Sequence, residues 1–169
     1  MVALLQDFTK AKEIVAEEAK KLNVEIPELG VMIETPSAAI AVETYTDDVD
    51  FFSIGTNDLI LYSLAADRGV ATLREYHDAL HPSVLQLINN VIEVGVKCNI
   101  EVSVCGDMAS DINGAKVLYA LGLRIFSLAP SQAPLILNSI LISQKKLRNL
   151  DKNEILNQKN SQSVRNIIN

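Results

Sequence analysis

The chain has 169 residues, a length that suits one domain with a core of its own. Hydrophobic residues make up 49% of it, and its formal net charge at pH 7 is −6, which argues against nucleic acid as the main partner because phosphate backbones bind basic surfaces. The sequence has neither an apolar run long enough to span a membrane nor the apolar core of a signal peptide, so we expect no membrane span and a cytoplasmic location.

Helical and strand-like patterns alternate along the chain. Residues 4–22 carry apolar side chains three and four positions apart, which predicts an amphipathic helix. We predict strands at residues 31–33, 49–54, 101–105 and 124–128. Further helices are predicted at residues 37–43, 57–66, 83–96, 111–121 and 133–142, with a mixed loop at residues 70–82.

This order predicts an α/β fold of one helix followed by four βα units, whose strands are parallel and whose connections are right-handed. Four units fit half of an eight-unit TIM (β/α)8 barrel or a small doubly wound sheet, and periodicity is compatible with both. We expect residues 1–144 to form this unit. Residues 145–169 are polar and rich in asparagine, so we expect a loosely attached tail that is partly helical or disordered.

Reactive side chains follow three of the predicted strands. Glu34 ends the first strand, Asn57 and Asp58 follow the second, and Cys105 ends the third. The carboxyl ends of parallel strands share one side of a sheet, where ligands bind. The two carboxylates could supply two oxygen ligands to Mg²⁺. Glu34 also fits a salt bridge to a lysine, and Asp58 also fits a carboxylate that interacts with a helix N-terminus.

The other side chains at this edge have two readings each. Asn57 can donate to a phosphate or carboxylate, or it can cap the helix that follows. Arg68 can clamp a planar anion, or it can pair with Asp67. Cys105 can be an inert small hydrophobe, but its place at a strand end before Gly106 favours acid–base chemistry.

The remaining reactive side chains have no motif around them. Cys98 and Cys105 resemble neither a disulfide framework nor a zinc site. Cys98 lies at the end of a predicted helix, where we expect it to be inert. His77 and His81 lie in an irregular stretch, and we interpret both as structural or surface residues.

Four segments carry a family resemblance. They are Gly-Val-Met-Ile-Glu-Thr-Pro at residues 30–36, Asp-Phe-Phe-Ser-Ile-Gly-Thr-Asn-Asp-Leu at 50–59, Ala-Ala-Asp-Arg-Gly at 65–69 and Val-Cys-Gly-Asp-Met-Ala at 104–109. In this order they resemble the phosphoenolpyruvate-utilising enzymes. The nearest branch is the phosphoenolpyruvate–protein phosphotransferases, which are enzyme I of the bacterial sugar phosphotransferase system. The resemblance is collinear over roughly residues 4–142.

The resemblance implies a fold, a ligand and roles for the residues at the strand ends. It implies the second half, strands five to eight, of a TIM (β/α)8 barrel that binds phosphoenolpyruvate and Mg²⁺ and forms homodimers. Glu34 and Asp58 would be the Mg²⁺ ligands, and Asn57 would contact the phosphate. Arg68 would also bind the substrate, and Cys105 would protonate the methylene carbon of the enolate as pyruvate forms.

The family's reaction passes the phosphoryl group of phosphoenolpyruvate to a histidine in an N-terminal domain and then to the phosphocarrier protein HPr during sugar uptake. That histidine segment and the first half of the barrel are not in this sequence, so we expect the isolated chain to be incomplete as a phosphotransferase. The family's usual Cys-Gly-Glu is Cys105-Gly106-Asp107 here, and its usual Gln is Leu61.

Two other functions fit the same segments. One is a fragment of pyruvate phosphate dikinase or phosphoenolpyruvate synthase. The other is a non-catalytic, degenerate half-barrel that acts as a dimerisation or regulatory module. In either case a half-barrel leaves open sheet edges and an uncovered core face, which predicts association with another subunit, in the simplest case a homodimer.

Overall fold

A single parallel sheet organises the chain, for which we have a computed structural model that describes residues 1–67, 69–73 and 75–169. Its strands are β1 (Gly30–Ile33), β2 (Phe51–Gly55), β3 (Glu101–Cys105) and β4 (Ile125–Phe126). They lie in the order β1-β2-β3-β4, so that each strand pairs with the next along the chain. The predicted α/β fold with parallel strands is confirmed.

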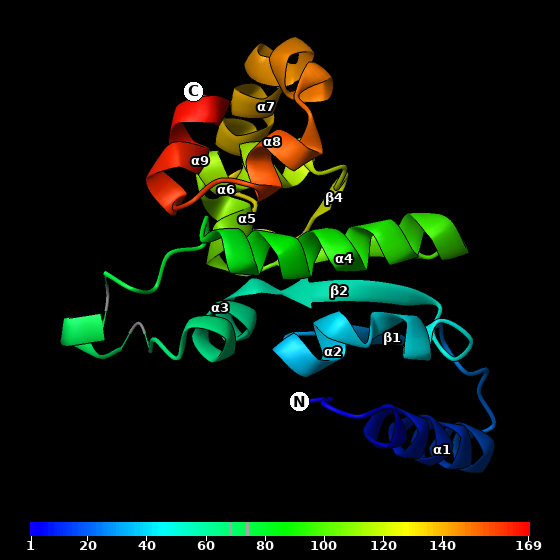
Figure 1. Cartoon of the computed structure of the whole chain (residues 1–169). Helices are drawn as coiled ribbons and strands as arrows, with labels where there is room; N and C mark the ends of the chain where they lie inside the picture. The colour runs from blue at the N-terminus through cyan, green and yellow to red at the C-terminus, as the bar shows by residue number, and fades with distance from the viewer. Residues whose placement is uncertain (68, 74) are drawn as a thin grey trace.

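Helices connect the strands and extend the chain at both ends (Figure 1). Those before β4 are α1 (Leu5–Leu22), α2 (Pro36–Ile40), η1 (Val42–Tyr45, a 3₁₀-helix), α3 (Thr56–Leu64), η2 (Ala71–Leu73, also 3₁₀), α4 (Pro82–Cys98), α5 (Asp107–Ser110) and α6 (Ile112–Ala120). Those after it are α7 (Ala133–Asn149), α8 (Lys152–Leu156) and α9 (Ser161–Ile168).

Capping residues explain where several helices begin. The Thr35 hydroxyl accepts a hydrogen bond from the N–H of Ala38 at 3.2 Å, and Pro36 occupies the first turn of α2. The carboxylate of Asp111 accepts one from the N–H of Gly114 at 2.7 Å, which confirms the predicted cap of α6. The helix predicted at residues 37–43 is broken instead, because α2 ends at Ile40 and the chain tightens into η1.

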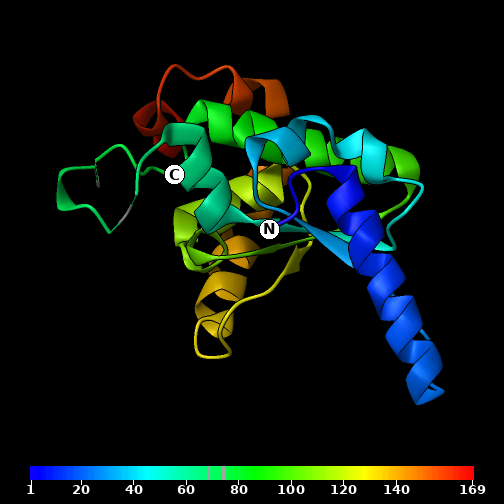
Figure 2. The same cartoon turned by 90° about the horizontal axis from the view of Figure 1, so that it is seen from below.

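The two faces of the sheet have different surroundings. Val31, Ile33 and Phe52 are buried, and α2, α3 and α4 cover one face of the sheet (Figure 2). On the opposite face Met32 is 41% exposed and Ile125 is 39% exposed. Parallel sheets are normally covered on both faces. This sheet is covered on one face only, and α1 and α7 project past its uncovered side at two ends (Figure 2).

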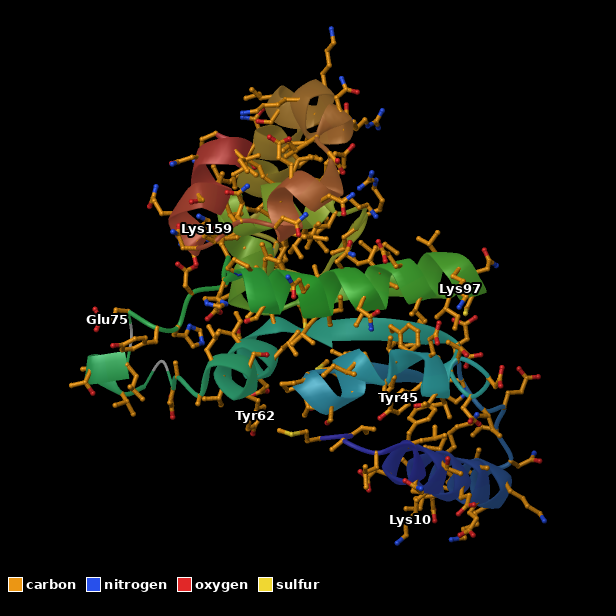
Figure 3. All side chains as sticks on the ribbon, in the orientation of Figure 1. Lys10, Tyr45, Tyr62, Glu75, Lys97 and Lys159 are labelled. Carbon is orange, nitrogen blue, oxygen red and sulfur yellow. The ribbon has the colours of Figure 1, made fainter. Side chains whose placement is uncertain are left out.

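Helix α1 is held against the β1–β2 connection. Phe8 is buried, and the Lys12 ammonium donates to the backbone carbonyl of Asp48 at 2.5 Å. The ring of Tyr45 is 1% exposed and lies between α1 and the sheet (Figure 3).

At the far end of α4, the Lys97 ammonium donates to the carboxylate of Glu43 at 2.7 Å. No helix in the described ranges is both long and apolar enough to cross a bilayer.

Residues 145–169 end in helices that pack against the rest of the domain. Helix α7 continues to Asn149, and α8 and α9 fold back onto the domain (Figure 1). A few apolar side chains of this segment are almost completely buried: Leu147, Ile155, Val164 and Ile168. The phenol oxygen of Tyr119 accepts hydrogen bonds from Gln144 at 3.0 Å and Arg148 at 2.9 Å. A sparse apolar face is therefore enough to bury this segment against the rest of the domain.

Candidate functional site

Strand register places Glu34, Gly55 and Cys105 at one level. Ile33 pairs with Ile54, so Glu34 lies one residue beyond that pair, and Gly55 pairs with Cys105. Adjacent strands are about 4.8 Å apart, which puts the backbones of Glu34 and Cys105 roughly 10 Å apart. A side chain on Gly55 would begin 3.0 Å from the Cβ of Glu34. The same side chain would lie 3.0 Å from the Sδ of Met32, so the strand centre between Glu34 and Cys105 is closely packed and requires glycine.

Asp58 lies beside Glu34. It belongs to the first turn of α3, which begins directly after β2. Burial raises the pKa of the Glu34 carboxyl, and the negative charge of Asp58 and a hydrogen bond with it raise that pKa further; the ammonium of the N-terminus partly offsets these effects. The two carboxyl groups therefore lie close together, and the charge of Asp58 disfavours the ionisation of Glu34.

Asn57 is fixed by the backbone that follows β3. Its Oδ1 accepts a hydrogen bond from the N–H of Asp107 at 2.9 Å, which leaves Nδ2 as the donor end of the amide. The hydroxyl of Thr56 donates to the carbonyl of Cys105 at 2.8 Å. Gly106 has φ of +95°, and a Cβ there would lie 2.3 Å from the Thr56 hydroxyl. The glycine therefore lets the ends of β2 and β3 interlock.

Cys105 is a free, half-buried thiol. Its Sγ donates to the carbonyl of Ile54 on the neighbouring strand at 3.7 Å. The thiol lies at the level of Glu34, with Gly55 of the middle strand between them. Such a group can supply a proton to a carbon atom bound between them.

A small cavity of about 70 Å³ adjoins this edge, lined by Asn57, Asp58, Leu61, Asp67 and His77. From the sequence we interpreted His77 as a structural or surface residue, because no motif surrounds it. The structure instead places it beside two predicted site residues, and only the folding back of residues 75–81 brings it there. The predicted substrate residue Arg68 lies outside the described residues.

Glu34 and Asp58 are the carboxylates that could hold a Mg²⁺ ion completed by water and a ligand. In the part of the chain that the structure describes, no cluster of three or more histidine, cysteine, aspartate or glutamate side chains is arranged to hold a metal ion. Mg²⁺ is usually held by one or two carboxylates together with water and substrate phosphates. The raised pKa of Glu34 fits this arrangement, since a cation between Glu34 and Asp58 would relieve their repulsion.

Comparison with known proteins identifies relatives for nearly the whole chain. Residues 1–145 match the family model of the PEP-utilising enzyme, PEP-binding domain. A protein of Listeria monocytogenes named phosphoenolpyruvate-protein phosphotransferase is 37% identical over 162 residues. Proteins of the same name from Staphylococcus aureus and Priestia megaterium are each 38% identical over 161 residues. These matches cover 92% of this chain but only 27% of each relative.

Proposed function

The chain belongs to the phosphoenolpyruvate-utilising enzymes, within their phosphoenolpyruvate-binding domain, and we propose that it is the C-terminal part of that domain in a phosphoenolpyruvate–protein phosphotransferase. In this proposal the four strands are strands five to eight of a TIM barrel, and the uncovered sheet face is its interior. The alternation between buried Ile33 and exposed Met32 along β1 supports this. In a closed barrel the interior would bury Met32, while Ile33 already lies under the helices on the other face.

One observation carries the proposal: Glu34, Gly55 and Cys105 lie abreast on three strands, with Asp58 beside Glu34. The backbones of the outer two strands lie roughly 10 Å apart. The side chains of Glu34 and Cys105 reach into this distance, and what remains suits a molecule the size of phosphoenolpyruvate. Glu34 and Asp58 would hold Mg²⁺, which supplies positive charge to phosphate and carboxylate oxygens when bound. Asn57 would donate from Nδ2 to a phosphate oxygen, and Arg68 would bind the same substrate.

Cys105 completes the chemistry of phosphoryl loss. When the phosphoryl group leaves phosphoenolpyruvate, the electron pair of the broken P–O bond remains on the enolate oxygen. The enolate then takes a proton at its methylene carbon. The Cys105 thiol would donate this proton, giving pyruvate and a thiolate. Positioning and charge neutralisation, rather than covalent bonding to the domain, would do the rest.

The remaining steps belong to parts of a longer protein. The relatives are named for phosphoryl transfer to a protein, and this chain spans about a quarter of their length. We propose that the phosphoryl group passes to a histidine in another domain and then to the phosphocarrier protein HPr, in cytoplasmic sugar uptake. A homodimer, or the other half of the barrel, would cover the open sheet face.

Calorimetry of phosphoenolpyruvate binding tests the site. We expect binding that requires Mg²⁺ and is lost in Glu34→Ala and in Asp58→Ala, whereas Glu17→Ala, which removes an exposed carboxylate on α1, leaves it unchanged. Absence of Mg²⁺-dependent binding in the unmodified chain, or equal binding by all four proteins, would favour a non-catalytic half-barrel.

The role of Cys105 has its own readout. A group that protonates the enolate also removes a proton from pyruvate in the reverse direction. In D₂O with Mg²⁺, we expect the methyl protons of pyruvate to exchange for deuterium in the presence of the chain, as followed by proton NMR. Cys105→Ser should abolish this exchange and keep phosphoenolpyruvate binding, and Cys98→Ser, at the exposed end of α4, should alter neither.

A further inference from the structure

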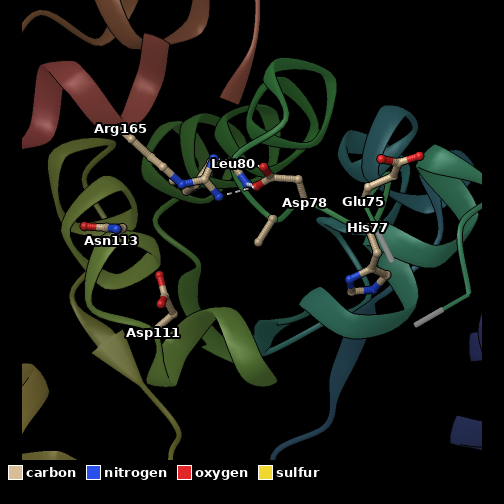
Figure 4. Close-up of a pocket in the computed structure, with 8 residues that line it drawn as sticks. Glu75, His77, Asp78, Leu80, Asp111, Asn113 and Arg165 are labelled. Carbon is tan, nitrogen blue, oxygen red and sulfur yellow. Dashed lines mark hydrogen bonds and ion pairs between the residues drawn. The ribbon is translucent and has the colours of Figure 1, made fainter. Parts of the chain in front are cut away.

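The last helix of the chain forms an ion pair with the loop that precedes α4. The guanidinium of Arg165 in α9 donates to both carboxylate oxygens of Asp78, at 2.9 Å each (Figure 4). The exposed fractions of the two side chains are 33% for Arg165 and 25% for Asp78. A paired, two-bond contact of this kind fixes geometry as well as adding energy. Residues 87 positions apart in the sequence are thereby joined.

Both ends of this ion pair are themselves fixed. Val164 and Ile168 on either side of Arg165 are almost completely buried, which anchors α9. On the other side, Asp78 also accepts a hydrogen bond from the N–H of Leu80 at 2.9 Å, and its carbonyl accepts one from the N–H of His81 at 3.1 Å. The pair therefore joins an anchored helix to a tightly turned segment.

The turned segment contains His77, which connects this contact to the strand-end edge. His77 lines a cavity of about 340 Å³ that also includes Asp78, Asp111 and Arg165 (Figure 4). It also lines the smaller cavity with Asn57 and Asp58. One imidazole thus borders both the ion pair and two of the proposed site residues, with Asp78 directly next to it in the chain.

We propose that Arg165 and Asp78 are positioning residues for the phosphoenolpyruvate site, and that they act by holding His77 beside Asn57 and Asp58. This rests on the proposed function, because it concerns the same site. The imidazole offers a neutral or charged N–H donor at the border of that cavity. Helix α9 thereby becomes a support of the site, although none of its residues lines the cavity with Asn57.

Arg165→Met tests this, because it removes the ion pair and keeps an apolar stem in place. With Mg²⁺ present we expect phosphoenolpyruvate to bind about tenfold more weakly, the lower end of what loss of a supporting outer contact produces. The charge-reversed double variant Arg165→Asp with Asp78→Arg should recover part of that loss. Lys97→Met, which breaks an ion pair at the distant end of α4, should leave binding unchanged.

A second readout separates positioning from general stability. The chain has two histidines, so their ring signals can be assigned in proton NMR with His77→Gln and His81→Gln. Arg165→Met should shift or broaden the His77 signal. The His81 signal should stay in place, because its ring contacts the hydroxyl of Ser83 at 2.8 Å.

The outcomes distinguish this inference from the proposed function. Binding within twofold of the unmodified chain in a folded Arg165→Met overturns the positioning role. If the unmodified chain shows no Mg²⁺-dependent binding, the proposed function fails. The His77 signal then decides the positioning claim alone, and an unchanged signal overturns it.

Discussion

The strand-end site and the C-terminal helices α8 and α9 are built in different ways. The site residues stand in short, distinctive segments, and parallel pairing of β1, β2 and β3 brings those segments together. The C-terminal helices are mostly polar, and their attachment depends on a few buried side chains such as Ile155 and Val164. A site on regular strands therefore follows from the order of the strands in the sequence, whereas docking of a polar segment depends on partners far along the chain.

The sharpest test of this comparison is a matched pair of leucine truncations in α7. Leu147 is 0% exposed and Leu141 is 55% exposed. We expect Leu147→Ala to lower the free energy of unfolding by about 3 kcal/mol, because it leaves a cavity in a closed environment. Leu141→Ala should cost less than about 1 kcal/mol. Urea denaturation measures both values. Equal, small effects would mean that the C-terminal segment is as loosely attached as its composition suggested.

Sequence patterns were sufficient for most of the fold. Each of the predicted strands is present, and the capping aspartate Asp111 begins α6 as expected. Several boundaries differ: α2 stops at Ile40, α7 continues to Asn149, and β4 is reduced to Ile125–Phe126. Hydrophobic periodicity and residue propensity locate a helix or strand more reliably than they locate its ends.

The site was predictable only in part. Register of parallel strands explains why Glu34 and Cys105 lie at one level, because strands of similar length start together. The approach of His77 to Asn57 was not predictable, because it depends on the path of an irregular loop. The ion pair between Arg165 and Asp78 was equally inaccessible, since neither residue has a motif and 87 positions separate them.

A pair of glycine substitutions tests the rigidity of the site itself. Gly106 and Gly122 both have positive φ, but a Cβ on Gly106 would lie 2.3 Å from the Thr56 hydroxyl, whereas one on Gly122 would meet nothing closer than 3.5 Å. We expect Gly122→Ala to cost about 1 kcal/mol and Gly106→Ala about 2–3 kcal/mol, because only the second adds a collision to the backbone strain. Thermal unfolding compares the two. Gly106→Ala should also weaken phosphoenolpyruvate binding, and equal stability losses would contradict the interlocked ends of β2 and β3.

The smallest expected effect is a gain in the free energy of unfolding rather than a loss. Glu34→Gln should stabilise the metal-free chain at pH 7 by roughly 0.5 kcal/mol, the size of interactions between partly exposed charges, because it removes a partly buried charge and its repulsion from Asp58. The folded-state pKa of Glu34 is raised, so the unfolded chain loses this proton first as pH increases. The wild-type chain therefore loses stability through the interval from the ordinary pKa of 4.5 up to the raised one.

The difference in the free energy of unfolding between Glu34→Gln and the wild-type chain should reach its full size above that pH interval. Below the interval it should vanish, because both the carboxyl and the amide are uncharged there. Urea denaturation at pH 4 and pH 7 measures it, with Glu17→Gln on the exposed face of α1 as the matched control. Addition of Mg²⁺ at pH 7 should reverse the order. A cation that binds the folded state stabilises the wild-type chain, and the amide variant lacks one of its two anionic ligands. A variant that is less stable than the wild type at pH 7 without metal would show that Glu34 has a favourable partner, and the carboxylate pair would then not be a site prepared for a cation.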